Sequence, residues 1–428
     1  MASTTLLMKT LQGTALALTL ALASCASGPK TVDPSESSIV QGDAAQLGFD
    51  PGKLNDIRVA YNADVMSGKI PGAYLLIGRH DKVAFQQGFG VQGPGQTTPA
   101  SDQTIYRVFS MTKPIVAVTA MTLVQEGKLN LDDPVSKYIP EFANVKVLQK
   151  DGTQTPATKP ILIRQLMSHT SGLIYGFVTA GQPISKIWID GGEMRSDLTA
   201  KDLSAQVFAK LPLIAEPGAA WNYSHGLDVL GGVIEVITKK PLDVAVKERV
   251  TGPLGMTDTA FYQPKEKSNR FAQPKDAGSL IAGVSLYYDY ASPTPYMQGG
   301  GGISSTAEDY LRFVLMLAHK GTYQGVQILK PETVDLMLVD QTTAEIRGKG
   351  LFFPGQGLGF GLGMSLVIDD TKTKTTGNGT FSWNGVAGTE WWYDPKNDLF
   401  MIFMQQDRAL LAEYQRKNRT MIYDALKK

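Results

Sequence analysis

The sequence predicts an α/β (α+β) protein in which one antiparallel sheet is formed from both ends of the chain, is flanked by helices and carries a mainly helical inserted domain. Strand-like segments lie near both ends, and helical patterns separated by Pro- and Gly-rich loops fill the middle. The 428 residues are 43% hydrophobic and 19% charged, a composition with enough apolar residues for a large core.

The first elements follow from local signals. A helix is predicted over residues 51–67, with Asp50 as N-cap, Pro51 at the first helical position and Leu54, Ile57 and Tyr61 on one face. The stretch 72–90, "GAYLLIGRHDKVAFQQGFG", predicts two strands joined at His80-Asp81. We assign residues 47–110 to the first part of the α/β domain.

The remaining elements divide into a helical middle and a second strand region. Residues 114–126 are apolar on every side, which predicts a buried helix that Gly127 ends. Further helices are predicted at 199–210 and 226–239 and from Thr306, and a last helix from about Ala409. Between the last two helices, "FGLGMSLVID", "GTFSWNGVAGTEWWYD" and "LFMIFMQQD" predict three successive strands. The helical domain is assigned to residues 111–300 and the second α/β part to 301–428.

The N-terminus has the pattern of a bacterial export signal. One positive charge at Lys9 precedes an apolar stretch from Leu11 to Leu22, which is too short for a stable membrane span, and Met8 is an alternative start to Met1. Leu22-Ala23-Ser24-Cys25 resembles a lipobox, which implies a signal peptide at 1–24, a lipid on Cys25 and attachment to the periplasmic side of the bacterial envelope. Residues 25–46 are small and polar and predict a flexible tether. A plain secretory signal, or an apolar leader on a cytoplasmic protein, is the alternative.

Charge and composition exclude several kinds of partner. Lys and Arg total 41 against 40 Asp and Glu, so no global field would attract nucleic acid, and the membrane is expected to be reached only through the lipid at Cys25. Cys25 is the single cysteine, which excludes an intramolecular disulfide. The histidines at 80, 169, 225 and 319 lack metal-ligand spacing, and no spacing implies a metal or a cofactor. His169 is expected to hold a turn by hydrogen bonds.

A serine and a lysine three residues apart begin the apolar helix, in "RVFSMTKPIV" at 107–116. Pro114 is tolerated only in the first helical turn, so Ser110 lies at or beside the N-cap and Lys113 one turn on. A buried lysine that is neutral part of the time can activate a serine. Serine is equally a preferred capping residue, and Ser27 and Lys30 form a second pair with the same spacing, so the motif alone does not decide between a nucleophile and a cap.

Several ordered blocks resemble the serine-hydrolase superfamily of class C β-lactamases and DD-peptidases, and are most similar to the β-lactamase-like carboxylesterases of family VIII. The resemblance runs from about Leu47 to the C-terminus. Its blocks are "SMTK" at 110–113, "LMSHTSGL" at 166–173, "PGAAWNYSHGLDVLGGVIE" at 217–235, "PLGMTDT" at 253–259, "GGGGISSTAEDYLRF" at 299–313 and "SWNGVAGTEWWYDP" at 382–395.

The resemblance implies roles for three residues. Ser110 would be the nucleophile, Lys113 the general base or the group that keeps a tyrosine deprotonated, and Tyr223 that tyrosine. An ionised Tyr223 and Lys113 would shift each other's pKa toward neutrality as one coupled pair. His225 stands where many β-lactamases have asparagine, and is either a donor to substrate or a loop residue without a role.

The third block departs from the β-lactamases. Trp383-Asn384-Gly385 replaces their Lys-Thr-Gly, which removes the ammonium that would pair with a substrate carboxylate and leaves an apolar wall that favours uncharged esters. Gly385 would let a substrate lie close to the strand, and the resemblance implies that the backbone N–H groups of Ser110 and Val386 form the oxyanion hole. Trp383 is alternatively a core aromatic of the strand.

Three functions are therefore considered, with the one that the sequence favours most given first. The first is a carboxylesterase that cleaves small, uncharged esters through an acyl-enzyme on Ser110; acyl transfer to an alcohol would use the same machinery. The second is a β-lactamase or DD-peptidase acting on cell-wall amides, for which Arg347 or Lys349 would have to replace the absent lysine. The third is a lipid-anchored binding protein without turnover.

Overall fold

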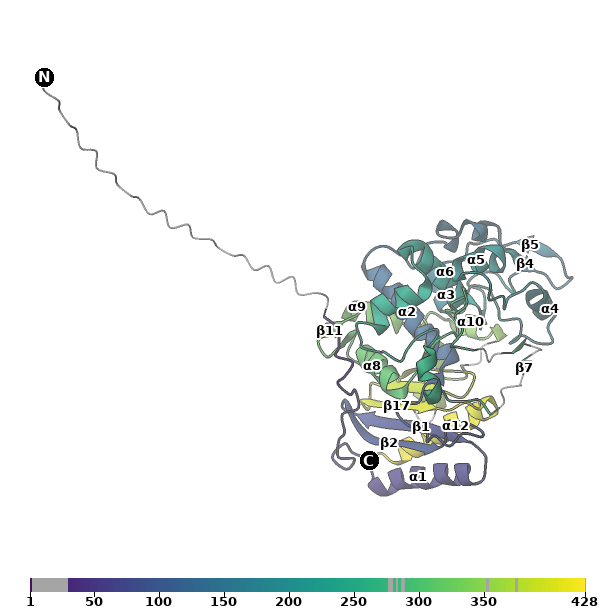
Figure 1. Cartoon of the computed structure of the whole chain (residues 1–428). Helices are drawn as coiled ribbons and strands as arrows, with labels where there is room; N and C mark the ends of the chain where they lie inside the picture. Colours follow the sequence, from purple (N-terminus) through teal and green to yellow (C-terminus); the bar gives the residue numbers. More distant parts are fainter. Residues whose placement is uncertain are drawn as a thin grey trace.

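The chain forms a sheet with helices on both of its faces and a larger helical part stacked beyond one face (Figure 1). The computed structural model describes Met1 and residues 30–275, 280–281, 284–285, 289–351, 354–373 and 376–427. The expected signal peptide at 1–24 and lipid attachment at Cys25 lie outside the described residues.

The sheet has seven strands in the order β13-β14-β15-β16-β17-β1-β2, and each neighbouring pair is antiparallel. Two strands come from the beginning of the chain and five from its end, which confirms the predicted sheet built from both ends. The strands are β1 (Gly72–Arg79), β2 (Lys82–Gly90), β13 (Leu358–Phe360), β14 (Ser365–Val367), β15 (Phe381–Asn384), β16 (Glu390–Asp394) and β17 (Leu399–Met404).

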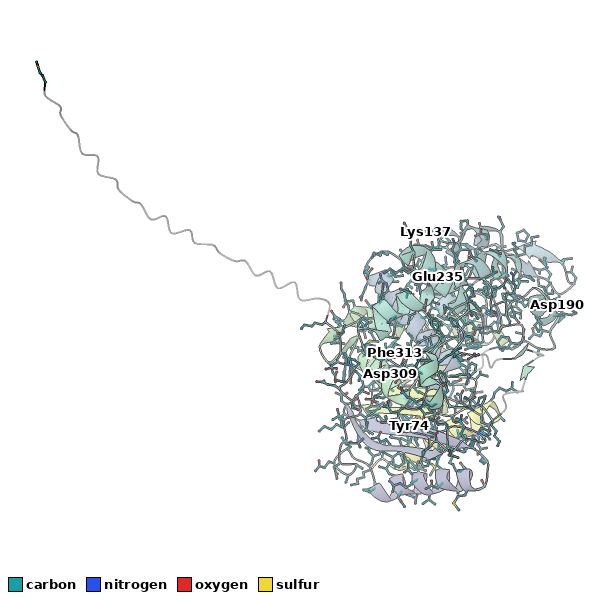
Figure 2. The ribbon with its side chains drawn as sticks, viewed as in Figure 1. Tyr74, Lys137, Asp190, Glu235, Asp309 and Phe313 are labelled. Atoms are coloured by element: carbon teal, nitrogen blue, oxygen red, sulfur yellow. The ribbon has the colours of Figure 1, made fainter. Side chains whose placement is uncertain are left out.

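Alternation along β1, the strand beside the edge strand β2, separates two cores. Ala73, Leu75 and Ile77 face a smaller core with helices α1 and α12, while Tyr74 and Leu76 face the large core that includes α8 and the helical part. β1 is therefore apolar along most of its length because both of its faces are covered. Figure 2 marks Tyr74 on the sheet with Phe313 of α8 above it.

Twelve helices are present in the described part of the chain: α1 (Pro51–Met66), α2 (Thr112–Gln125), α3 (Ile163–Met167), α4 (Pro183–Asp190), α5 (Ala200–Gln206), α6 (Gly226–Thr238), α7 (Leu242–Val246), α8 (Ala307–Ala318), α9 (Pro331–Met337), α10 (Ala344–Arg347), α11 (Asp370–Thr373) and α12 (Leu411–Asp424). The predicted caps are present: the side chains of Asp50, Thr199 and Thr306 accept backbone N–H groups at the starts of α1, α5 and α8. The helix expected over 199–210 ends at Gln206, and a 3-10 turn over Phe208–Lys210 follows it.

Five two-stranded pairs are also present among the described residues. Four are antiparallel, and the pair β6 with β12 is parallel. The pairs are β3 (Tyr106–Arg107) with β9 (Ser304–Ser305), β4 (Lys146–Leu148) with β5 (Gln154–Pro156), β6 (Trp221–Asn222) with β12 (Gly350–Leu351), β7 (Leu280–Ile281) with β8 (Val284–Ser285), and β10 (Thr322–Tyr323) with β11 (Val326–Gln327).

The expectation of three strands after α8 is wrong, because the region holds five strands of the main sheet. The first two predicted segments each contain a reversal: Gly361 N donates to Met364 O between β13 and β14, and Gly385 N donates to Thr389 O between β15 and β16. Glycine can also lie inside a strand, so each pair of short strands gave the sequence pattern of a single strand with an interruption.

The expected flexible tether is wrong for residues 32–42, which we call the N-terminal strap. The strap adds to the free edge of β2, where Val83 N donates to Val40 O at 2.8 Å and Gly42 N donates to Val83 O at 3.0 Å. The buried guanidinium of Arg312 on α8 donates to the carbonyl oxygens of Asp33 and Glu36. The strap is held mainly through its backbone groups. Its polar side chains therefore did not indicate that it is ordered against the domain.

Among the described residues, none of the helices is both long enough and apolar enough to cross a bilayer.

Arg312→Met is expected to lower the free energy of unfolding by about 1–3 kcal/mol, because two strap carbonyl groups lose a charged donor. Urea unfolding measures the change, and limited proteolysis should cut the variant within residues 32–42. Arg416→Met, at an exposed position of α12, is the matched control. Equal stability and equal protease resistance of the two variants would show that Arg312 does not hold the strap.

Candidate functional site

Ser110 lies at the start of α2 without capping it. It is the middle residue of a 3-10 turn over Phe109–Met111, and neither this turn nor α2 receives a side-chain cap. Phe109 has a φ of 44°, a left-handed conformation that is costly for a bulky residue. The Ser110 hydroxyl is thus directed to other partners, and capping does not account for this serine.

Lys113 reaches Ser110 from the first turn of α2. Its side chain is buried, with Nζ 3.2 Å from Ser110 Oγ and 2.6 Å from the backbone oxygen of Gly300. Nζ also lies 4.4 Å from the ring centre of Tyr223 and 5.2 Å from that of Tyr175. Two aromatic faces, one carbonyl oxygen and the serine therefore surround the amine.

Burial sets the protonation of this amine. Desolvation lowers the pKa of Lys113 from its usual value near 10.5 to about 7, although the Asp228 carboxylate works in the opposite direction. Near neutral pH a large fraction of Lys113 is the free amine. The free amine has a lone pair for the serine proton, which an ammonium group lacks.

Tyr223 completes the contact around Ser110 from a different part of the chain. It follows β6, and its hydroxyl lies 2.6 Å from Ser110 Oγ. Burial raises the pKa of Tyr223 above that of an ordinary tyrosine, while the hydrogen bonds with Ser110 and Trp383 oppose the rise. The expectation that Tyr223 and Lys113 both shift toward neutrality is therefore wrong for the tyrosine, because the buried phenol stays protonated.

His169 and Trp383 hold the tyrosine in place. Asn222 N donates to His169 O at 2.9 Å, the His169 ring lies 3.1 Å from Ser224 Oγ, and the backbone of His169 is left-handed with φ of 58°. Burial and the neighbouring Lys113 lower the pKa of His169, so it is neutral. Trp383 packs on Tyr223 with a ring-centre distance of 5.8 Å.

His225 lies between two buried carboxylates. Its Nδ1 is 2.9 Å from Asp228 Oδ2 and its Nε2 is 3.2 Å from Glu193 Oε2. Burial alone would lower the pKa of His225, but the contacts with Asp228 and Glu193 outweigh it and raise the pKa. Neither expected reading of His225, a donor to substrate or a loop residue without a role, describes this arrangement.

Asp228 and Gly300 belong to the site and were not predicted from the sequence. Asp228 Oδ1 accepts from Gly300 N at 3.0 Å, and Gly300 O accepts from Lys113. A Cβ at Gly300 would lie 2.1 Å from the Tyr175 hydroxyl, so no side chain fits there. One signal was available: Asp228 is a charged residue between apolar neighbours in the first turn of the 226–238 helix, on a face that had to be buried.

A cavity of about 110 Å³ opens beside these groups. Of the described residues that line it, none is Lys or Arg, and most are apolar or aromatic. They are Phe109, Ser110, Tyr175, Phe177, Val178, Met194, Tyr223, His225, Asp228, Gln298, Gly300, Gly301 and Val386.

The structure places Trp383, Gly385 and Val386 in different positions relative to the cavity. Val386 lines the cavity beside Ser110. Gly385 brings the end of β15 against the backbone before the serine, since a Cβ there would lie 2.3 Å from Val108 O. Trp383 is buried behind Tyr223, with Phe360 at a ring-centre distance of 5.1 Å, and is not among the lining residues. It supports the wall of the cavity from within the core.

Cations that could replace the missing lysine are bound elsewhere. Arg347 donates to Asp340 at 2.7 Å, and Lys349 pairs with Glu345 on the exposed side of α10. Among the described residues, no three His, Cys, Asp or Glu side chains are arranged to hold a metal ion.

The beta-lactamase family model matches residues 52–425. The chain belongs to the beta-lactamase family. Protein Rv1367c of Mycobacterium tuberculosis is 38% identical over 79% of this chain and 86% of its own length, and esterase EstB of Burkholderia gladioli is 32% identical over 87% and 93%. The solved structure of EstCE1, a hydrolase with promiscuous acyltransferase activity, superposes with a TM-score of 0.73 and 27% identity over 88% of this chain and 99% of its own. This family member is a serine hydrolase of the β-lactamase-like fold.

Tyr223→Phe is expected to lower kcat/KM for a p-nitrophenyl ester by about 100-fold or more, because it removes the hydroxyl that donates to Ser110 Oγ. Tyr175→Phe is the matched control: its ring also covers Lys113, but its hydroxyl bonds to Asp228, and we expect a loss of about tenfold or less. Equal losses in the two variants would contradict a specific role for the Tyr223 hydroxyl.

Proposed function

We propose that this protein is a carboxylesterase that cleaves short, uncharged esters through an acyl-enzyme on Ser110. One observation carries the proposal: a buried amine with a pKa of about 7 lies 3.2 Å from a serine hydroxyl whose other partner is a protonated tyrosine. The base and the proton donor flank one nucleophile, which is the minimum arrangement for acyl transfer.

Acylation begins from the free amine of Lys113. Ser110 Oγ attacks the ester carbonyl carbon, its proton passes to Lys113 Nζ, and the carbonyl oxygen becomes an oxyanion. The backbone N–H groups of Ser110 and Val386 are the proposed donors to that oxyanion, which is supported by their shared position at the cavity. The C–O bond of the ester then breaks, and Tyr223 supplies a proton to the departing alkoxide and regains one from Lys113.

Deacylation reverses the direction of proton transfer. A water molecule attacks the acyl carbon and gives a proton to Tyr223 as Tyr223 passes its own proton to Lys113. The bond to Ser110 Oγ then breaks, Lys113 returns the proton to Ser110 Oγ, and a carboxylic acid is released. An alcohol in place of water would give a new ester by the same steps. The structural neighbour EstCE1 is a hydrolase with promiscuous acyltransferase activity, which favours this second outcome as a side activity.

The cavity supports uncharged substrates. None of its described lining residues is Lys or Arg, and Asp228 contributes a negative charge. A substrate carboxylate would therefore enter without a counter-ion, at a cost in free energy, whereas an alkyl or aryl ester would contact Phe177, Val178 and Met194. The relative EstB is an esterase, which supports an ester substrate. The binding-protein alternative leaves a lysine with a pKa of about 7 beside a serine unexplained.

We also propose that the enzyme is exported and anchored by a lipid on Cys25, as its N-terminal sequence suggests. Globomycin, which blocks cleavage of lipoprotein signals, should cause the uncleaved form to accumulate. Cys25→Ser should release a soluble form or leave the precursor uncleaved.

Ser110→Ala is expected to lower turnover of p-nitrophenyl butyrate by about 1,000-fold or more. Ser27→Ala, in the second Ser-x-x-Lys of the chain, is the matched control and should leave turnover unchanged. Mass spectrometry of the quenched wild-type reaction should find the butyryl group on the peptide that contains Ser110.

Nitrocefin distinguishes the alternatives in the same preparations. Wild-type protein should open nitrocefin much more slowly than it cleaves the ester. Efficient nitrocefin turnover with weak ester turnover would favour a β-lactamase, and turnover of neither compound would favour a binding protein.

A further inference from the structure

The cluster of Glu193, His225 and Asp228, of which His225 and Asp228 line the cavity, has no part in the reaction steps above. All three side chains are at most 2% exposed, and they place two carboxylates on one histidine, with the Asp228 carboxylate also acting on Lys113. Buried carboxylates without compensation are costly, and they would also stabilise the protonated form of a nearby lysine. Offsetting this charge would keep a larger fraction of Lys113 as the free amine.

We propose that His225 is a positioning residue that offsets the Asp228 charge beside Lys113 and, through Asp228 and Gly300, orients the lysine amine toward Ser110. This inference rests on the proposed function only for its kinetic consequence; the contacts themselves do not depend on it.

The orienting path consists of three consecutive hydrogen bonds. His225 Nδ1 contacts Asp228 Oδ2 at 2.9 Å, Asp228 Oδ1 accepts from Gly300 N at 3.0 Å, and Gly300 O accepts from Lys113 Nζ at 2.6 Å. Because one glycine contacts the carboxylate through its nitrogen and the lysine through its oxygen, a movement of Asp228 would move the acceptor that aims the amine.

The electrostatic argument follows from the groups around each residue. Lys113 faces Ser110, the rings of Tyr175 and Tyr223, the neutral His169 and, through space, Asp228. In this set Asp228 is the group that favours the protonated lysine. Asp228 in turn is bound by His225, by the Tyr175 hydroxyl and by Gly300 N.

A second carboxylate keeps the histidine in place. Glu193 Oε2 contacts His225 Nε2 and accepts from Gly176 N at 2.7 Å, which ties the 175–194 segment to the start of α6. The His225 ring also packs on Phe208 at 4.5 Å and on Tyr175 at 4.1 Å. With both ring nitrogens on carboxylates, His225 is held as the doubly protonated ring, and its positive charge is shared between Asp228 and Glu193.

Two substitutions in the same cluster should move the pKa of Lys113 in different ways. His225→Gln removes the positive charge and keeps a donor for Asp228, so the pKa of Lys113 should rise by about one unit. Glu193→Gln breaks the other half of the same clamp and removes a negative charge, so the pKa should stay unchanged or fall. If the substitutions only disturbed the local structure, the pKa of Lys113 would shift in the same direction in both variants.

The test is a direct titration of Lys113 in full-length protein labelled with ¹³C at lysine Cε, with the signal assigned from its absence in Lys113→Met. The expected result is a higher midpoint in His225→Gln but not in Glu193→Gln, with both variants folded by circular dichroism. An unchanged midpoint in His225→Gln, or the same rise in both variants, would overturn the inference. If His225→Gln fails to fold, His225→Asn is titrated under the same criterion.

The pH profile of ester turnover supplies the kinetic counterpart. The acid limb of kcat/KM should move to higher pH in His225→Gln by the same amount, which would lower the rate at pH 7 by up to about tenfold. Absence of ester turnover in the wild type would overturn the proposed function, and the titration would still decide the role of His225.

Discussion

The burial of one lysine amine determines the chemistry of this protein. Lys113 lies in the first turn of an apolar helix, where desolvation brings its pKa to about 7 and leaves it able to accept a proton from Ser110. An exposed lysine at the same distance would be an ammonium group at neutral pH and could not act as a base. The fold must therefore exclude water from this amine while keeping the serine open to the cavity.

Segments from distant parts of the chain combine to meet both requirements. α2 supplies the serine and the lysine, the segment after β6 supplies Tyr223, and the glycine-rich loop before α8 supplies the carbonyl oxygen of Gly300. β15 closes the other side, where Gly385 permits backbone contact with Val108 and Trp383 fills the space behind Tyr223. The absence of a Cβ at Gly300 and Gly385 is thus a requirement of the site.

Local patterns predicted the elements well wherever one element carries its own signal. The sequence predicted three such features directly. They are the hairpin at His80-Asp81, where both residues have positive φ, the caps of α1 and α8, and the helix α2, which is apolar on all sides. The N-terminal strap and the reversals within 358–394 could not, because the strap is held by backbone hydrogen bonds to distant residues and the strands on each side of the reversals are only three to five residues long.

The same distinction applies to the site. Ser110, Lys113 and Tyr223 lie in blocks that resemble a known superfamily, whereas Glu193, Asp228 and Gly300 act through contacts between residues 32 to 187 positions apart. No spacing along the chain encodes such contacts. The protonation of Tyr223 was also beyond sequence reasoning, since it depends on how completely the phenol is buried.

The most direct test of the central claim is the rate at which an uncharged phosphonate ester labels Ser110, followed by mass spectrometry from about pH 5 to about pH 9. The account predicts a rate that rises with pH to a plateau, with a midpoint near 7, where Lys113 loses its proton. A rate that does not change across this range, or that rises only as pH approaches the ordinary lysine value near 10.5, would contradict it.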